Sequence, residues 1–283
     1  MRITKLLQDV VQRFPKGYLL YYYVIKLVPL KRSKVISELD GNIFLITSTG
    51  RTGTTLFAKM LNAAGTCEVV HEPFSSEQHF HRICLENPLF AEKYLQEFRL
   101  KEIFLRRNTK KYGEVNSALR RVVKDLKKIL PKTPTIHIVR NGYDVVSSIL
   151  NRKTFTGDDK FYRNLVPHES TISKEDWNGF SRFEKICFMW AEENRWLSEN
   201  CDVTVKFENL IDDYEYFYQH ICLPTKIDVN REVWCQHTKS RVNKNKNYED
   251  INNPTEWTTR QHEIFNRICG NEMKRYGYKE YKI

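Results

Sequence analysis

A run of glycine, threonine and arginine follows an apolar segment early in the chain. Residues 43–46 read Ile-Phe-Leu-Ile, a pattern typical of a strand buried on both faces of a parallel sheet. Shortly after it come Thr49, Gly50, Arg51, Thr52, Gly53, Thr54 and Thr55. Glycines let a backbone pass close to a ligand, while threonine hydroxyls and the free N–H groups at a helix start donate to anions. With the positive charge of Arg51 in its middle, this stretch predicts a phosphate-binding loop.

The loop lacks the lysine of the common nucleotide-triphosphate motif. The pattern G-x-x-x-x-G-K-[ST] is absent, because Thr54 and Thr55 follow Gly53 directly and the cation stands earlier, at Arg51. The residue pair that would hold magnesium is therefore missing, and no metal is expected. A plain strand-to-helix connection with an exposed arginine would show the same short pattern, so a second motif has to decide between the two interpretations.

A second strand and helix start, with a basic residue at their junction, lies in the middle of the chain. Residues 135–139 read Thr-Ile-His-Ile-Val and are followed by Arg140, and Ser148 comes eight residues later, about two helical turns on. Ligands in open α/β sheets bind beyond the carboxyl ends of the strands. Arg51, Arg140 and the Ser148 hydroxyl are therefore expected to face one crevice and one anionic ligand.

Together the two motifs resemble those of sulfotransferases that use 3′-phosphoadenosine 5′-phosphosulfate (PAPS). In that family the first loop holds the 5′-phosphosulfate, and an arginine followed eight residues later by a serine holds the 3′-phosphate. The resemblance implies that residues 49–55, Arg140 and Ser148 bind PAPS. Arg241, in a basic loop before Trp257, is similar to a family residue that closes over the 3′-phosphate.

Further segments extend the resemblance and narrow it. Arg51 stands where cytosolic members usually carry lysine. An arginine at this position is similar to the carbohydrate and bacterial branches of the family. The likeness covers residues 42–278, with His-Glu-Pro at 71–73, Lys-Phe-Glu-Asn-Leu at 206–210 and a C-terminal segment at 273–278. It implies an α/β fold of three layers, in which helices flank a parallel sheet, as in P-loop nucleotide hydrolases and sulfotransferases.

The rest of the chain alternates expected helices and strands, which indicates a parallel sheet covered on both faces. The expected helices span residues 54–64, 116–130, 180–200, 209–222 and 259–276, and further strands span residues 68–70 and 203–207. We divide the chain into an N-terminal helical segment, residues 1–41, and a sulfotransferase domain, residues 42–283. The polar, irregular segment 151–179 is expected to form a lid over the acceptor.

The N-terminal segment carries aromatic residues between basic flanks at residues 16–34. Such a segment fits a helix at a membrane interface or, the interpretation we favour, a helix packed on the domain with its lysines reaching solvent. We find no signal peptide and no run of about 18 apolar residues. The seven cysteines are scattered without a C-x-x-C pair. These features predict a cytoplasmic protein, with peripheral membrane contact through residues 16–34 as an alternative.

Composition fits one enzyme with anionic partners. The 283 residues are 41% hydrophobic, with 46 basic and 35 acidic residues and a formal net charge of +11. This length and apolar content can bury one large core. The excess of positive charge favours PAPS, an acidic glycan or a membrane surface as partners. Zinc-finger spacing and an RNA-recognition aromatic motif are absent from the sequence, so nucleic acid is not expected.

Sulfuryl transfer requires the enzyme to position donor and acceptor and to neutralise charge on the leaving oxygen, a task that suits Arg51. The acceptor hydroxyl also needs a base. Glu72 is the first choice, because it follows an expected strand end and Pro73 is expected to hold it in an extended conformation. Relatives in the carbohydrate and bacterial branches often use a glutamate at this place. The competing bases are Glu114, His71, His79 and His81.

The function that this sequence predicts is transfer of a sulfuryl group from PAPS to a hydroxyl or amine acceptor, with a glycan or glycolipid favoured. Two alternatives stay open. One is a small-molecule kinase with a degenerate phosphate loop, and the other is a non-catalytic module that binds anions. The sequence indicates no oligomeric state.

Overall fold

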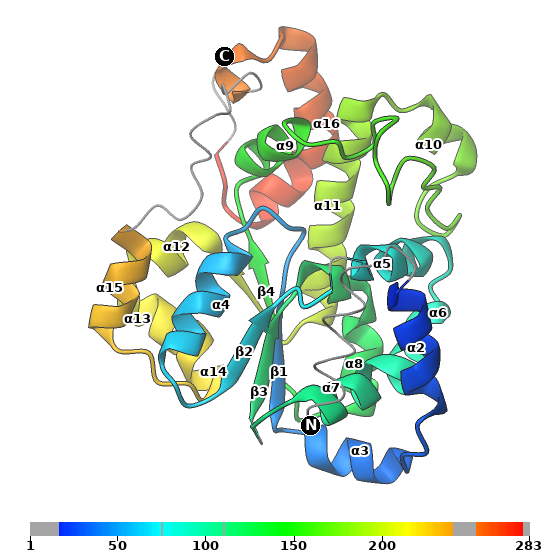
Figure 1. Cartoon of the computed structure of the whole chain (residues 1–283). Helices are drawn as coiled ribbons and strands as arrows, with labels where there is room; N and C mark the ends of the chain where they lie inside the picture. The colour runs from blue at the N-terminus through cyan, green and yellow to red at the C-terminus, as the bar shows by residue number, and fades with distance from the viewer. Residues whose placement is uncertain (1–16, 75, 110, 240–252, 280–283) are drawn as a thin grey trace.

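A five-stranded parallel sheet forms the centre of the molecule in the computed structural model, which describes residues 17–74, 76–109, 111–239 and 253–279 (Figure 1). The strand order is β2-β3-β1-β4-β5. The strands are β1 (Ile43–Thr47), β2 (Glu68–His71), β3 (Tyr112–Val115), β4 (Thr135–Val139) and β5 (Val203–Lys206). The predicted α/β fold, with a parallel sheet flanked by helices, is confirmed.

The two strands that precede the phosphate-binding motifs are neighbours at the centre of this sheet. Every residue of β1 and of β4 is buried, as their apolar sequences predict. Leu45 of β1 pairs with Thr135 of β4 on one side and with Glu114 of β3 on the other. The chain continues from β1 to β2 on one side, while β4 lies on the opposite side. The carboxyl ends of β1 and β4 therefore flank the point where the strand order reverses, which is where such sheets bind ligands.

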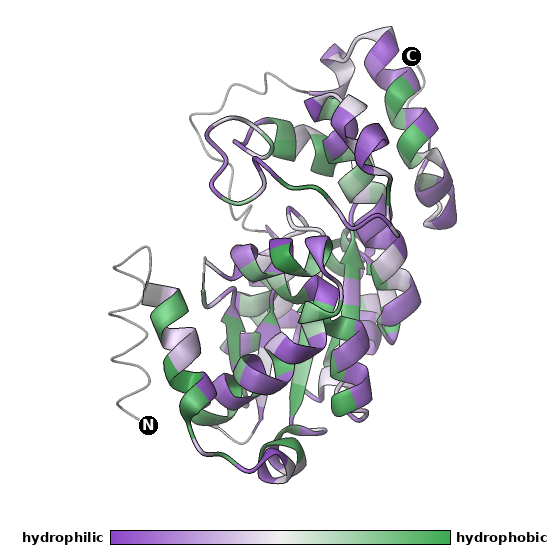
Figure 2. Ribbon diagram, turned by 90° about the vertical axis from the view of Figure 1, so that its right-hand side faces the viewer, coloured by the Kyte–Doolittle hydropathy of each residue, from purple (hydrophilic) through white to green (hydrophobic). Residues whose placement is uncertain are grey.

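Helices cover both faces of the sheet. Ile43 and Leu45 pack into a layer that contains α2, α5 and α7, whereas Phe44 and Ile46 pack into a layer that contains α4 and α12. This alternation along one strand produces the three layers, and the central strands are largely green in Figure 2. The α-helices are α2 (Gly17–Leu27), α3 (Arg32–Leu39), α4 (Thr54–Ala63), α5 (Glu77–Glu86), α6 (Phe90–Tyr94), α7 (Leu100–Arg106), α8 (Val123–Ile129), α9 (Gly142–Leu150), α10 (Lys174–Gly179), α11 (Arg182–Asn200), α12 (Phe207–Asp212), α13 (Tyr214–Phe217), α14 (Leu223–Thr225), α15 (Arg231–Lys239) and α16 (Thr259–Arg275). The 3₁₀ and π segments are η1 (Leu95–Arg99), η2 (Ser117–Val122), η3 (Tyr218–Cys222) and η4 (Pro254–Glu256).

Two of the long helices expected from the sequence are not single α-helices. Residues 117–129 are helical as expected, but they begin with the 3₁₀ segment η2, where Asn116 accepts a hydrogen bond from the Ala118 N–H, and only α8 is α-helical. The expected helix over 209–222 is divided into α12, α13 and η3, because the Asp213 side chain caps a new helix. Asn and Asp side chains compete for backbone N–H groups and so favour a fresh helix start.

Aromatic side chains hold α2 against the domain. Tyr18, Tyr21, Tyr22 and Ile25 are buried in the core cluster that also contains Ile43 and Leu45 of β1. The rings of Tyr18 and Phe74 lie 5.0 Å apart. One face of α2 is thus part of the domain core. None of the described helices is both long and apolar enough to cross a membrane.

The segment 151–179 forms a wall beside the crevice, and α10 is its one α-helix within the described residues. Its start is fastened by Arg182, whose guanidinium donates to backbone oxygens of Ile149, Leu150, Arg152 and Thr154. Its end is fastened by Trp177, whose Nε1 donates to the Leu165 oxygen at 2.6 Å. That this segment acts as a lid over an acceptor stays a prediction.

Candidate active site

The loop after β1 needs unusual backbone angles. Gly50, Arg51 and Gly53 have φ angles of 84°, 61° and 70°, in the left-handed region that glycine adopts freely and arginine rarely. A Cβ added to Gly53 would lie 2.5 Å from Cε2 of Phe207, so this position excludes a side chain on steric grounds as well. Helix α4 begins at Thr54, and its first free N–H groups border the loop. Strain of this kind is typical of functional sites.

Arg51 and Ser148 connect the two motifs directly. The Nε of Arg51 donates to Oγ of Ser148 at 2.8 Å, although 97 residues separate them. From the second motif, Nη1 of Arg140 donates to the Arg51 backbone oxygen at 3.0 Å, and its Nη2 donates to Asp144 at 3.3 Å. The structure therefore brings Arg51, Arg140 and Ser148 together, and their binding of one anionic ligand stays a prediction.

Beside the phosphate-binding loop the protein leaves three buried donors unsatisfied. Oγ1 of Thr49, Oγ1 of Thr52 and Nε of Arg140 are buried and have no hydrogen-bond partner among the described residues. Leaving such groups unpaired costs free energy. Burial and the neighbouring guanidiniums of Arg152 and Arg140 also lower the pKa of Arg51. A bound anion would offset the repulsion among these guanidiniums, so the residues fit the phosphate groups of PAPS.

Two outlying segments of the family resemblance, 206–210 and 273–278, meet beside the second motif. One carboxylate oxygen of Glu208 accepts a hydrogen bond from the Asn141 N–H at 3.0 Å. The other accepts one from the Tyr278 hydroxyl at 2.7 Å. Glu208 therefore anchors the start of α9, the helix that carries Ser147 and Ser148, to the C-terminal segment.

His71 contacts the phosphate-binding loop. Its Nε2 lies 2.9 Å from Oγ1 of Thr54 and 3.4 Å from Oγ1 of Thr55. Burial lowers the pKa of His71 below its usual value near 6.5, so the imidazole is neutral at neutral pH. This histidine, a competing base in the sequence interpretation, is placed to orient the two threonines.

Glu72 has a backbone conformation opposite to the expected one. Its φ is 38°, so the extended conformation expected from Pro73 is wrong. The bend follows β2 directly and turns the carboxylate toward η2. There the N–H of Ser117 donates to Oε1 of Glu72 at 3.3 Å, and the Ser117 hydroxyl donates to the same oxygen. Glu72 lines the same cavity as Arg51 and Thr54. The contacts with Ser117 compensate for the strained backbone and fix the carboxylate.

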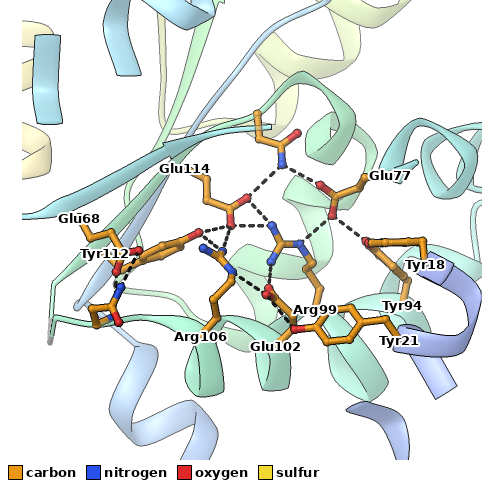
Figure 3. Close-up of polar contacts among 12 residues, drawn as sticks. Tyr18, Tyr21, Glu68, Glu77, Tyr94, Arg99, Glu102, Arg106, Tyr112 and Glu114 are labelled. Atoms are coloured by element: carbon orange, nitrogen blue, oxygen red, sulfur yellow. Dashed lines mark hydrogen bonds and ion pairs between the residues drawn. The ribbon is translucent and has the colours of Figure 1, made fainter. Parts of the chain in front are cut away.

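Glu114 belongs to a buried ion network (Figure 3). Nη2 of Arg99 donates to its carboxylate at 2.5 Å and Nη2 of Arg106 at 3.2 Å. The Tyr112 hydroxyl and the Asn116 amide donate to it as well, at 2.5 and 3.0 Å. Burial alone would raise the pKa of Glu114, but the two guanidiniums more than offset it and the pKa is lowered. The carboxylate is 2% exposed, so it is poorly placed to reach a substrate.

A cavity of about 310 Å³ extends from the loop toward the wall segment. On the loop side it is bordered by Thr49, Gly50, Arg51, Thr54, Thr55, His71 and Glu72. On the far side it is bordered by polar and apolar side chains, namely Gln78, Ser117, Arg120, Ile149, Thr154, Phe155, Tyr162, Ile186, Met189, Trp190 and Glu193. The space beyond the loop is therefore large enough for part of an acceptor as well as for a transferable group.

Several residues on the far side were not expected from the sequence. Nε of Arg120 donates to Glu193 at 2.7 Å. The hydroxyl of Tyr162, from the wall segment, donates to Gln78 at 2.5 Å and lies 2.9 Å from Nδ1 of His81. These residue types are common, and they become a site only through tertiary contact, so no local pattern indicates them.

The remaining candidate residues lie in different surroundings. Burial lowers the pKa of His81 to about 4, and its ring is enclosed. His79 is exposed on α5. Arg241 lies outside the described residues. Trp257, which follows that loop, packs into the core with its ring 5.6 Å from Tyr143 and 5.1 Å from Phe183.

No family model matches the sequence, and no curated protein matches it. Among solved structures, the chain is similar to a sulfotransferase from Alicyclobacillus acidocaldarius, with 12% identity and a TM-score of 0.47; the match covers 84% of this chain and 96% of the other. It is also similar to mouse sulfotransferase SULT7A1 complexed with PAP, with 14% identity and a TM-score of 0.41, covering 86% and 89% of the two chains. Both similarities are distant.

Proposed function

We propose that this protein transfers a sulfuryl group from PAPS to a hydroxyl acceptor. The observation that supports it most is the bond between Arg51 and Ser148, with Arg140 donating to the Arg51 backbone. It joins the two motifs that the sequence predicts to bind anions, and the Arg140 side chain, 30% exposed, can reach a second phosphate. A donor with separate 5′ and 3′ phosphates suits this arrangement, whereas ATP has no 3′-phosphate.

In this proposal, residues 49–55 hold the 5′-phosphosulfate, and Arg140 with Ser148 holds the 3′-phosphate, with Arg241 as a further contact. PAPS supplies the sulfuryl group and a phosphate leaving group. Arg51 neutralises the charge that develops on the phosphate oxygen as its bond to sulfur breaks. The residues that lie within the crevice require no metal for this role.

Glu72 takes the proton of the acceptor hydroxyl while the acceptor oxygen bonds to sulfur. Ser117 restrains the carboxylate, since it donates twice to the same oxygen. The second carboxylate oxygen is left for the acceptor. Thr54, oriented by His71, borders the same space and donates to the transferring group.

We propose a glycan or glycolipid as the acceptor, which receives the sulfuryl group on a hydroxyl. An amine is the alternative acceptor group. Ile149, Phe155 and Met189 offer an apolar surface to a sugar face or a lipid-linked segment, and Gln78 and Arg120 offer donors to hydroxyls. The seven unpaired cysteines favour a reducing compartment, so we propose the cytoplasm.

Transfer of labelled sulfate from PAPS to a panel of glycolipids, polysaccharides and simple phenols tests this function. We expect label on an anionic saccharide, at a rate that falls as salt rises, because its attraction to a protein of net charge +11 is screened over about 8 Å at physiological ionic strength. Salt-indifferent transfer to a phenol would contradict the acceptor class alone. Phosphate transfer from ATP with magnesium would indicate the kinase, and tight binding without turnover on any acceptor would indicate the binding module.

A further inference from the structure

The outer face of α2 is apolar and exposed. Among the described residues seven large hydrophobic side chains are exposed, and five of them lie on this helix. They are Leu19, Leu20, Tyr23, Val24 and Leu27, with exposed fractions of 45%, 67%, 59%, 39% and 81%. Their spacing of three and four residues places them on one side of the helix. We call this set the outer face of α2.

This face is unusual because the opposite face of the helix is apolar as well. Tyr18, Tyr21, Tyr22 and Ile25 are already buried against the domain. A helix on the surface of a soluble domain normally turns polar residues outward, and one that is apolar all round is normally covered. In Figure 2 green segments alternate with pale ones along α2. The remaining two exposed hydrophobic residues, Leu89 and Leu223, are isolated and need no such cover.

The surroundings of the outer face are cationic. The sequence has no acidic residue from Gly17 to Ser37 and four basic ones, Lys26, Lys31, Arg32 and Lys34. Lys31, Arg32 and Lys34 are exposed just beyond the C-terminal end of α2, while Lys26 pairs with Glu97 at 2.8 Å. The ammonium group of Lys101 donates to the backbone oxygens of Lys26 and Val28 and fixes the exit of the helix.

We propose that the outer face of α2 docks on the surface of an anionic lipid bilayer. The eleven residues of α2 span about 16 Å, too short to cross a bilayer of roughly 30 Å, so the helix lies in the interfacial plane. Leu20 and Leu27 enter the boundary between headgroups and acyl chains, and the Tyr23 ring lies at the headgroup level. The exposed basic residues beyond the helix pair with anionic headgroups. A second copy of this chain is a poorer partner, because it would bring two cationic clusters together.

Flotation of the full chain with vesicles tests this proposal without any measurement of activity, so its outcome does not depend on the proposed function. We expect binding to mixed phosphatidylcholine–phosphatidylserine vesicles, weaker binding to phosphatidylcholine alone, and release as salt rises. Leu20→Ser and Leu27→Ser should each weaken binding roughly tenfold. Lys31→Gln and Arg32→Gln should each weaken it roughly fivefold, on the anionic vesicles only.

Matched controls lie elsewhere on the surface. Leu89→Ser removes a leucine that is 88% exposed, and Lys153→Gln removes a lysine whose side chain is 75% exposed, so both should leave binding unchanged. The proposal is overturned if the parent does not bind anionic vesicles, or if the α2 variants bind like the controls. It is also overturned if Leu27→Ser lowers the melting temperature without lipid, because the face would then be covered within the chain. Conversion of a dimer to a monomer by Leu20→Ser would overturn it too, in favour of contact between copies.

Discussion

Nε of Arg51 donates to Oγ of Ser148 at 2.8 Å, so the side chain of the first motif is held by the side chain of the second. Arg140 adds a bond to the Arg51 backbone at 3.0 Å. Two guanidiniums are thus kept near one another, and Asp144, 50% exposed at its side chain, is the carboxylate that pairs with Arg140. The arrangement is preorganised for a ligand with more than one phosphate group.

Adenosine 3′,5′-bisphosphate should therefore stabilise the fold against heat more than ATP does, since it places a phosphate at Arg140. At a ligand concentration of about 100 times Kd, mass action gives a gain of about 2.7 kcal/mol, visible as a rise of a few degrees in Tm. Arg140→Ala should remove most of the difference between the two ligands, and Arg163→Ala, an exposed arginine of the wall segment, should not. Thermal unfolding with each ligand measures this. A larger rise with ATP and magnesium would contradict it.

Glu72→Gln should lower turnover by roughly 10²–10⁴ while leaving nucleotide binding intact, because the amide keeps the hydrogen bonds from Ser117 in reach but cannot take a proton. Labelled-sulfate transfer and calorimetric titration of the same preparation separate the two quantities. Normal turnover in Glu72→Gln would show that the proton goes elsewhere. Loss of nucleotide binding together with turnover would show that Glu72 has a structural role.

Glu114→Gln should act on stability. The buried network around it contains the carboxylates of Glu77, Glu102 and Glu114 and the guanidiniums of Arg99 and Arg106. Glu114 accepts from both guanidiniums, so glutamine would lose these charge-assisted bonds and turn an NH2 group toward buried donors, which costs roughly 3–5 kcal/mol. Urea unfolding should show this loss, and turnover per folded molecule should stay near the parent value. A stable, inactive Glu114→Gln would instead make this glutamate the base.

The strand runs and the glycine-containing loop could be predicted because the pattern lies within a few consecutive residues. Strand β1, the loop over 49–55, and Arg140 after β4 are such cases, and their proximity follows from the rule on strand ends. The left-handed backbone of Glu72 could not be predicted, because Pro73 favours an extended conformation and the contact of the Glu72 carboxylate with Ser117 of η2 is tertiary. The site positions of Arg120 and Tyr162 could not be predicted either, because their contacts join elements far apart in the chain.

Gly53→Ala should destabilise the loop more than a change at a comparable glycine. Gly53 and Gly65 have φ angles of 70° and 71°, so an alanine is strained equally at both. The added Cβ at Gly53 meets Phe207 at 2.5 Å, whereas nothing lies within 4 Å of it at Gly65. The clash adds roughly 1–3 kcal/mol of destabilisation, measured by urea unfolding, and weakens nucleotide binding. Equal effects of Gly53→Ala and Gly65→Ala would contradict this account of the loop.

Two buried histidines should make the fold less stable as the pH falls below neutral. Burial lowers the pKa of His81 and of His137 to about 4. The unfolded chain takes up protons on these groups near pH ~6.5, while the folded protein does not do so until about pH 4, so stability is present above pH ~6.5 and is lost as the pH falls through this window.

The loss should be about 1.4 kcal/mol per pH unit for each histidine. His137 can be isolated with His137→Gln, because a glutamine amide can still reach Oδ1 of Asn194, which the imidazole contacts at 2.9 Å, but does not titrate. Subtracting the variant's pH profile of unfolding free energy from that of the parent removes the contributions of the carboxylates that both share. The difference in unfolding free energy between parent and variant should change by about 1.4 kcal/mol per pH unit between pH ~6.5 and pH ~4. A constant difference would mean that His137 is protonated as readily in the folded protein as in the unfolded chain.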